Sequence, residues 1–410
     1  MMSEKYPYQW RSLLLMVMAW GFAGVVHNCV SFLFPYFSEH FQLNTGHDGY
    51  LTGTLAFFWT LSILYCGPLS DRRGQVKVMA PGLCLGGVAL LALAVSGSLV
   101  MLYVFTALAG LGCGSIVSSS FSFLAEQSDP KYRGLFFGTA QSSFTLIGSA
   151  IGSVVFTRLG ATAIGWRGCY LITAILVLFA AAFIFFGGRH IPRAAQQNDS
   201  EDAHSFRELL AYKNVVLSAL LASLTMMWYF TAAAFTILYL MEAKNLSEVA
   251  AGVIFAGFGS GGFIGEFCAP FISDRLGRKS TTILAVTIGG GCFAAFVLLP
   301  LSAMGMTLAL AGASCFMSGA MAILNSVVPS ESVPLHLVAT ATAFIPAYGE
   351  LMGGVIAPVI TGGLSGAVGT SQVMVVLAVL PVLVWCGLFF LKETAPAVLA
   401  RRSKQRPEGM

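Results

Sequence analysis

The sequence predicts an all-α membrane protein with twelve transmembrane helices in two six-helix bundles. Of its 410 residues, 57% are hydrophobic and only 10% are charged, whereas a soluble domain carries about 25% charged residues. So few charges cannot cover the surface of a water-soluble particle of this size. Apolar runs of about the 20 residues that span a bilayer follow one another along the chain, and the longest polar break comes after the sixth run.

The apolar runs give the expected positions of the helices. The first six lie near 12–37, 49–68, 78–97, 99–124, 134–157 and 168–188. The second six lie near 214–240, 248–272, 280–300, 304–328, 337–362 and 371–391. The first run is too long for the apolar core of a signal peptide and has no clear cleavage site, so we interpret it as the first membrane helix.

The polar break predicts the domain organisation. It contains Q-Q-N-D-S-E-D, from Gln196 to Asp202, which is the composition of a loop. We therefore expect an N-terminal bundle over 1–188, a linker over 189–213, a C-terminal bundle over 214–392 and a basic cytoplasmic tail over 393–410. Such a tail is suited to contact with anionic lipid.

The basic residues predict the orientation in the membrane. If the N-terminus lies in the cytoplasm and the helices alternate in direction, every Lys and Arg except Arg158, Arg167 and Lys244 falls on the cytoplasmic side. Lys and Arg are enriched in cytoplasmic loops. We therefore expect a multi-pass inner-membrane protein with both termini in the cytoplasm.

A short motif recurs after the second helix of each half. The first loop reads G-P-L-S-D-R-R-G from Gly67 to Gly74, and the second reads P-F-I-S-D-R-L-G-R-K from Pro270 to Lys279. Both contain S-D-R-x-G. Glycine suits a tight turn between antiparallel helices, and an acidic residue is stabilised near a helix N-terminus. We predict a gating role for these loops, through Asp71, Arg72, Gly74, Asp274, Arg275 and Gly277.

The repeated loop closely resembles G-x-L-x-D-R-x-G-R-R, the signature of the major facilitator superfamily. The first copy departs from it, because Gln75 and Val76 stand where the family has basic residues and Lys77 comes one place late, whereas the second copy keeps Arg278 and Lys279. The resemblance implies the major facilitator fold and alternating access between two bundles, with the substrate near the midplane. It also implies that helices 1, 2, 4, 5, 7, 8, 10 and 11 face the central cavity.

Two features of drug/proton antiporters in that superfamily are missing here. Many of those proteins carry an arginine four residues before a glycine in helix 4, whereas this chain has Thr106 four residues before Gly110. They also have a Gly-Pro motif in helix 5, whereas Gly138–Gly152 contains no proline. The stretches that begin at Gly165 (G-W-R-G-C-Y-L-I) and Pro329 (P-S-E-S-V-P-L-H-L) instead resemble symporters of small metabolites and organic acids.

Ionisable side chains inside membrane helices are costly and mark function. Glu266 lies in helix 8, roughly 12 Å from its cytoplasmic end, and Glu350 lies roughly 20 Å into helix 11, at about 1.5 Å per residue. His27 is similarly central in helix 1. A carboxyl away from water favours its neutral form and can load and release a proton as water access alternates. We predict that these three residues couple protons or bind substrate.

Polar and aromatic neighbours complete the predicted substrate pocket. No Lys or Arg lies clearly inside a membrane helix, and Arg158 is near the outer end of helix 5. A cavity with two carboxyls and no fixed cation favours a neutral, zwitterionic or cationic substrate, whereas the resemblance favours an organic acid, so the charge of the substrate stays open. The expected pocket residues are Asn28, Gln141, Ser142, Trp228, Tyr229, Asn325 and Tyr348.

These observations predict a secondary transporter that imports a small metabolite together with protons. The alternative is a proton-coupled antiporter that exports a drug or metabolite. An ATP-driven pump would need a G-x-x-x-x-G-K-[ST] loop, a receptor would need a soluble domain, and an enzyme would need a catalytic motif; none is apparent. The nine cysteines form no CxxC pair. We expect no cofactor, no metal and no nucleic-acid partner, and we expect a monomer in the lipid bilayer.

Overall fold

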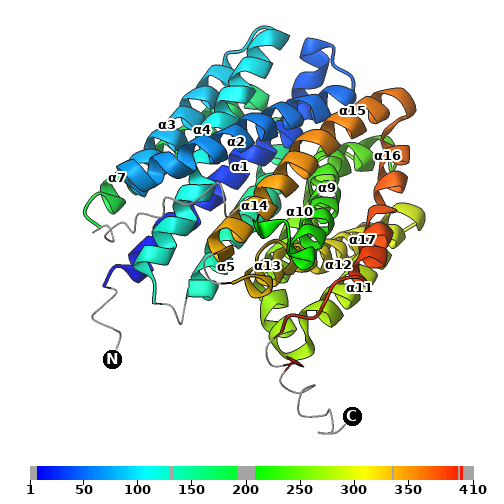
Figure 1. The fold of residues 1–410 in the computed structure, drawn as a ribbon. Coiled ribbons are helices and arrows are strands. Elements are labelled where there is room, and N and C mark those ends of the chain that lie inside the picture. The colour runs from blue at the N-terminus through cyan, green and yellow to red at the C-terminus, as the bar shows by residue number, and fades with distance from the viewer. Residues whose placement is uncertain (1–6, 130–132, 192–207, 335–336, 396–397, 400–410) are drawn as a thin grey trace, which may run out of the picture.

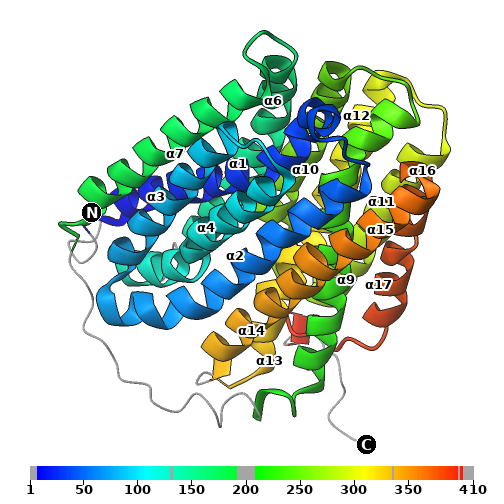
Figure 2. The ribbon, with the colours of Figure 1, turned by 90° about the horizontal axis from the view of Figure 1, so that it is seen from above.

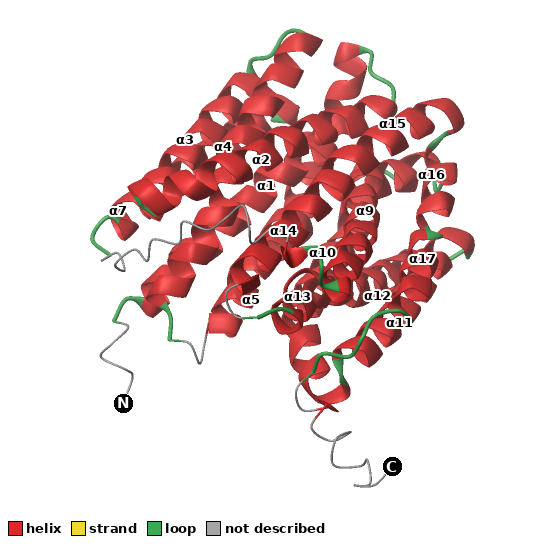
Figure 3. Cartoon of the chain, viewed as in Figure 1, coloured by secondary structure: helices red, strands yellow, loops and turns green. Residues whose placement is uncertain are grey.

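The structure is a computed structural model that describes residues 7–129, 133–191, 208–334, 337–395 and 398–399. Within these ranges every regular element is a helix (Figure 3). Twelve described segments are long and apolar enough to cross a membrane, which confirms the predicted all-α membrane fold. Most of the expected linker, at 192–207, and most of the expected tail, at 396–397 and 400–410, lie outside the described residues.

Six spans make up each half of the chain, and Figure 2 shows the two halves side by side. The N-terminal spans are α1 (Gln9–Phe41), α2 (Gly46–Arg73), α3 (Gln75–Ala94), α4 (Leu99–Gln127), a fifth span of α5 (Arg133–Ser143), η1 (Phe144–Ile151) and α6 (Gly152–Gly160), and α7 (Gly165–Gly188).

The C-terminal spans begin with α9 (Lys213–Glu242), α10 (Glu248–Leu276) and α11 (Arg278–Leu298). The tenth span combines α12 (Ala303–Ala322), η2 (Ile323–Val327) and α13 (Val328–Ser332). The eleventh span combines α14 (Val338–Glu350), η4 (Leu351–Ile356) and α15 (Ala357–Val368). The twelfth span combines α16 (Thr370–Leu377) and α17 (Leu380–Leu388).

The two S-D-R-x-G loops fold in the same way. Gly74 and Gly277 have φ values of 100° and 98°, in the region that favours glycine. In each loop the serine hydroxyl donates to the carbonyl three residues earlier, at 2.8 Å from Ser70 and 2.7 Å from Ser273. We call the end of the bundle with these loops the motif end and the opposite end the far end; both described chain ends lie at the motif end (Figure 1).

The two halves pack closely at the far end. There α2 lies beside α15 in both views (Figures 1 and 2), and the hydroxyl of Ser365 donates to that of Thr45 at 3.1 Å. A Cβ added to Gly46 would lie 2.8 Å from the Gly362 carbonyl oxygen, and a Cβ on Gly49 would lie 2.8 Å from Gly362 Cα. Glycine is therefore required for this close approach of two helix backbones across the halves.

The first residues of the tail are held against the motif end. The Glu393 carboxylate accepts from the backbone N–H groups of Arg278 at 2.7 Å and Lys279 at 3.2 Å, and so caps the N-terminus of α11. We expected a motif aspartate in that position. Asp274 instead pairs with the Arg278 side chain at 2.5 Å, because it lies one turn earlier on α10, where its side chain meets the guanidinium rather than the helix end.

Candidate functional site in the core between the halves

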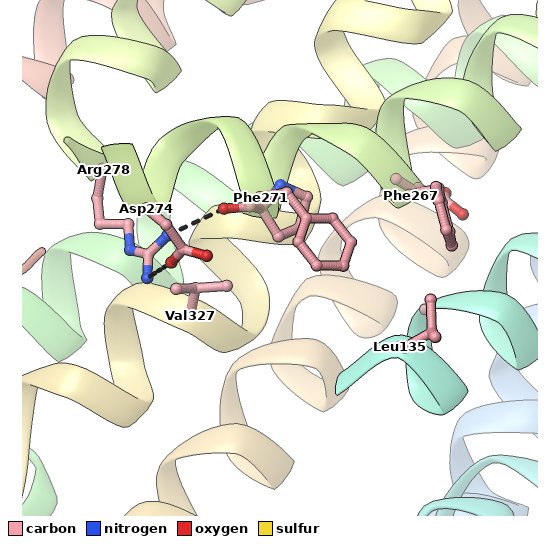
Figure 4. Close-up of a pocket in the computed structure, with 9 residues that line it drawn as sticks. Leu135, Phe267, Phe271, Asp274, Arg278 and Val327 are labelled. Atoms are coloured by element: carbon pink, nitrogen blue, oxygen red, sulfur yellow. Dashed lines mark hydrogen bonds and ion pairs between the residues drawn. The ribbon is translucent and has the colours of Figure 1, made fainter. Parts of the chain in front are cut away.

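A cavity of about 260 Å³ opens between the halves on the motif-end side. Its N-terminal wall is Leu135 and Gly138 on α5, and its C-terminal wall includes Glu266 and Phe267 on α10. Figure 4 shows Leu135 facing α10 across this space, with Arg278 and Asp274 paired at its outer edge. Since the far end is packed shut, this cavity gives the core its access from the motif end.

Glu266 lies at the inner wall of the cavity, within a polar cluster that both halves supply. The residue is only 8% exposed. Gly262 lies one helical turn earlier on α10 and has no side chain, which leaves space beside Glu266. A Cβ built on Gly262 would lie 3.0 Å from the Ser314 hydroxyl oxygen, 3.4 Å from that of Ser318 and 3.4 Å from the Thr145 methyl group. Thr145 belongs to η1 in the N-terminal half and approaches Glu266, so the carboxyl lies at the contact between the halves.

Tyr229 completes this cluster from α9, where its hydroxyl faces both Ser149 of η1 and Glu266. A buried polar atom without a partner costs about 1–3 kcal/mol, so a concentration of such atoms points to a binding site for a polar ligand. Five buried atoms of the cluster have no hydrogen-bond partner among the described residues: Ser149 Oγ, Tyr229 Oη, Glu266 Oε2, Ser314 Oγ and Ser318 Oγ.

Three spans become π-helical at the level of this cluster. The segment η1 carries Thr145 and Ser149, η2 carries Asn325, and η4 begins directly after Glu350. Asn325 Oδ1 is buried and has no partner among the described residues. Short π-helical segments inside α-helices occur frequently at functional sites. They lie here in spans 5, 10 and 11, which are three of the eight spans that the resemblance assigned to the cavity.

Glu350 lies against the opposite half as well. Its residue is 9% exposed, and its Oε1 lies 2.9 Å from where a Cβ on Gly354 would stand. Ala56 Cβ of α2 borders the same position at 3.1 Å. Glu350 therefore approaches α2 across the interface between the halves, just as Glu266 approaches η1.

His27 is enclosed by three aromatic rings, which we call the His27 box. Trp59 of α2 lies 5.5 Å from the imidazole, Phe144 of η1 lies 5.6 Å away, and Phe230 of α9 lies 5.3 Å away between ring centroids. His27 is 4% exposed, and its Nε2 atom is buried with no partner among the described residues. Phe230 comes from the C-terminal half, so the box spans the interface.

The remaining predicted pocket residues differ in their surroundings. Asn28 donates to the Gly24 carbonyl within its own helix at 2.8 Å, and Ser142 donates to the Thr139 carbonyl at 3.3 Å. Local bonds therefore engage both side chains. Gln141 is half-buried.

The two other aromatic residues predicted for the pocket do not join the Glu266 cluster. Trp228 is fully buried and packs on Phe258 and Phe293 inside the C-terminal half. Tyr348 is half-buried and stacks on Phe344. Tyr229 faces the cluster although its chain neighbour Trp228 does not, because successive helical side chains point about 100° apart.

The sequence reading missed the buried carboxyl of Asp48. It lies in the first turn of α2, is fully buried, and neither carboxyl oxygen has a hydrogen-bond partner among the described residues. The Ser31 hydroxyl of α1 approaches this carboxyl. Asp48 precedes the apolar run at 49–68, so it resembles a loop residue, and only the three-dimensional packing reveals its burial.

The core is acidic in its composition. Among the described residues, Asp48, Glu266 and Glu350 are the buried carboxyls, and Arg278 is the one buried Arg or Lys. Arg278 lies at the motif end, where it binds Glu331 at 2.8 Å. In the same part of the chain, no group of three His, Cys, Asp or Glu side chains could hold a metal ion. His27 is the one buried histidine among the described residues.

The gating residues differ in what the structure describes. The pair between Asp274 and Arg278, and the bond from Arg278 to Glu331, both stay inside the C-terminal half. Arg275 is exposed. The side chain of Asp71 lies outside the described residues. In this state the described contacts of the second loop stiffen its own half, so a contact between the bundles stays a prediction.

This architecture matches a known family. A model described as the Major Facilitator Superfamily matches residues 12–355. The chain belongs to this superfamily. It is 24% identical to the cis,cis-muconate transport protein of Acinetobacter baylyi over 387 residues, which cover 90% of this chain and 88% of that one. Members of the superfamily are transporters, and so this chain is a membrane transporter of small molecules and not an enzyme.

Two further likenesses accompany this match. It is 26% identical to the 4-hydroxybenzoate transporter of Pseudomonas aeruginosa over 190 residues, which cover 46% of this chain and 41% of that relative. A bacterial homologue of the human lysosomal transporter Spinster, solved in an inward-facing and unoccupied conformation, superposes with a TM-score of 0.79 at 18% identity and covers 95% of this chain and 97% of its own. This structural likeness shows the superfamily fold.

Proposed function

We propose that this chain is a monomeric inner-membrane transporter that takes up a small organic acid together with protons by alternating access. The observation that carries this proposal is Glu266. Its carboxyl is buried where α10 meets η1, it borders the cavity between the halves, and its Oε2 atom has no partner among the described residues. A carboxyl without a cation at such a site can serve as a proton carrier.

The arrangement of the halves supports alternating access. The far end is closed by backbone contacts between α2 and α15, and the motif end has the cavity that reaches Glu266. The basic residues concentrate at the motif end, and such residues are enriched in cytoplasmic loops. We therefore assign the motif end and both termini to the cytoplasm, and we take the structure as the state that is open to the cytoplasm.

The burial of Glu266 and Glu350 supports the coupling of proton transfer to the change of state. Removing an ionised carboxylate from water costs several kcal/mol unless a counter-charge compensates. The one buried Arg or Lys of the described chain, Arg278, pairs with Asp274 and Glu331 at the outer edge of the cavity and not with Glu266 or Glu350. Each carboxyl is therefore neutral while it is enclosed and can release its proton when water reaches it. Transitions between the two states then carry protons with the substrate.

The relatives support the substrate class. Two of them transport 4-hydroxybenzoate and cis,cis-muconate by their names, and both compounds are small unsaturated organic acids. An acidic core disfavours an anion unless protons accompany it, and coupling to protons supplies that compensation. We therefore assign a small organic acid as the substrate.

Proteoliposomes loaded with the wild-type protein test this function with labelled 4-hydroxybenzoate. A pH gradient that is acidic outside should drive accumulation. Glu350→Gln should abolish this accumulation but retain counterflow exchange, because glutamine keeps the size and polarity of the side chain but cannot release a proton. Glu266→Gln should give a similar or milder defect. Glu39→Gln, at an exposed far-end position, is the matched control.

Three results would change the proposal. Loss of exchange together with accumulation in Glu350→Gln would mean that this carboxyl binds substrate directly. Wild-type accumulation in the double variant of Glu266 and Glu350 would exclude both as proton carriers. Substrate movement against the proton flow would establish the export antiporter instead.

A further inference from the structure

The arrangement around His27 connects it to both core carboxyls. Phe144 and Thr145 are consecutive in η1: the first contacts His27 and the second approaches Glu266. Phe230 and Tyr229 are consecutive in α9 and divide in the same way. Each half therefore contributes two consecutive residues, of which one contacts the imidazole and the other approaches the Glu266 carboxyl.

The second carboxyl reaches the His27 box through α2. Glu350 approaches Ala56, and Trp59, one helical turn further along the same helix, packs edge-on against His27. Residues three apart on a helix lie on one face. The residues that enclose His27 therefore lie on α2, η1 and α9, and each of these elements also contacts one of the two core carboxyls or a neighbour of it.

The unpartnered Nε2 atom indicates what the box binds. A buried imidazole nitrogen without a partner is costly, and at 4% exposure its partner must be a bound ligand or a water molecule. Aromatic rings pack favourably against a planar unsaturated body in edge or offset arrangements. The buried carboxyls on the helices around the box are Asp48 on α2, Glu266 on α10 and Glu350 on α14, and Tyr229 on α9 adds a buried phenol. The one buried Arg or Lys among the described residues, Arg278, lies at the motif end. An anionic group in the box therefore has His27 as its basic partner.

We propose that His27 anchors the carboxylate of the transported acid through Nε2 and gains a proton from the loading side as it does so. The pair of imidazolium and carboxylate is neutral overall, and so an anion can enter a core that contains two carboxyls. This inference rests on the proposed function, since it names the residue that recognises the organic acid.

The same geometry links binding to the state of the transporter. Phe230 covers the imidazole from the C-terminal half, whereas Trp59 and Phe144 come from the N-terminal half. A relative movement of the halves therefore changes the access to Nε2. His27 accordingly selects the charge of the substrate at the point where the halves meet.

Isothermal titration calorimetry on the full-length protein in detergent tests the role of His27. The probes are 4-hydroxybenzoate, its neutral analogue 4-hydroxybenzamide and its cationic analogue 4-hydroxybenzamidine. The wild type should prefer the acid over the amide by about tenfold or more, as a charged hydrogen bond supplies. Titrations in two buffers with different ionisation enthalpies at pH 7.5 should show uptake of about one proton per bound acid, because a buried imidazole is neutral there.

His27→Gln should abolish both the preference and the proton uptake while amide binding stays unchanged. Trp228→Phe is the control, because it removes another buried, unpartnered N–H that lies inside the C-terminal half and outside the box. A variant at His27 that keeps the preference or the proton uptake would overturn the proposal, as would tighter binding of the amidine or no binding of the acid by the wild type. If His27→Gln loses the preference but the wild type never accumulates acid along a pH gradient, the proposed coupling fails and the anchor stands.

Discussion

Replacing Arg278 should destabilise the C-terminal half, because this guanidinium at the start of α11 binds four residues of α10 and α13. It binds Glu331 at 2.8 and 3.2 Å, the Ser273 hydroxyl at 2.6 Å and the Pro270 carbonyl at 3.1 Å, and it pairs with Asp274. Arg278 is only 5% exposed. Pro270, Ser273 and Asp274 lie in the last turns of α10, and Glu331 lies in α13.

The magnitude follows from the exposure of the partners. Removing one partner of a buried pair costs about 3–5 kcal/mol. The Asp274 side chain is 58% exposed, so its pair contributes only about 0–1 kcal/mol. The Glu331 side chain is 20% exposed and keeps the hydroxyl of Thr394 as a donor. We therefore expect Arg278→Gln to cost about 3 kcal/mol, at the lower end of the range for a buried pair.

A thermal unfolding assay in detergent, with a dye that reacts with newly exposed cysteines, measures this effect. For a unit of about 200 residues, 3 kcal/mol corresponds to a decrease in Tm of about 6–12 °C. Arg275→Gln is the matched control, because Arg275 is exposed on the same helix end, and it should change Tm by less than about 1 °C. If Arg278→Gln melts within about 1 °C of the wild type, the network does not stabilise the half and the reasoning is wrong.

Two further predictions concern the closure of each end. Gly49→Val should hold α2 and α15 apart at the far end and destabilise the closed state by about 1–3 kcal/mol. The ratio of the states with the far end open and closed then changes about 5- to 150-fold. Labelling of a Thr45→Cys probe by an impermeant thiol reagent should rise accordingly. Gly97→Val, where an added Cβ would meet nothing within 4 Å, should leave labelling unchanged, and equal labelling in both would exclude the packing argument. Asp71→Asn and Asp274→Asn should slow counterflow exchange without reducing the amount of inserted protein, and Asp71→Asn should have the larger effect; normal exchange in both would remove the gating role.

The sequence alone determined the fold and the most unusual residues of the core. Twelve apolar runs specify membrane helices because length and hydropathy are local properties of the chain, and the repeated S-D-R-x-G loop divides them into two related halves. Glu266, Glu350 and His27 could be identified in the same way, since an ionisable residue within an apolar run is visible without any neighbour. The positive φ values at Gly74 and Gly277 were likewise expected from the need for a tight turn.

The tertiary structure alone decided which polar residues meet. Ser314 and Ser318 border Gly262, one turn from Glu266, and Ser149 lies beside Tyr229, only because η1, α9, α10 and α12 pack together. Serines in membrane helices are too common for the sequence to single these out. The sequence gives no reason to separate the neighbouring aromatic residues Trp228 and Tyr229. The helix directs Trp228 into the interior of the C-terminal half and Tyr229 toward Glu266.

Long-range packing also decided the roles at the ends of the helices. Asp48 resembles a loop residue in the sequence, and the packing of α1 and α2 buries it completely. The sequence assigns Glu393 to the tail, and the fold places it against Arg278, 115 residues earlier in the chain, where it caps α11. Burial and hydrogen bonding of this kind depend on contacts between segments that are distant in the sequence. A local sequence pattern does not specify which distant segment packs against a given residue.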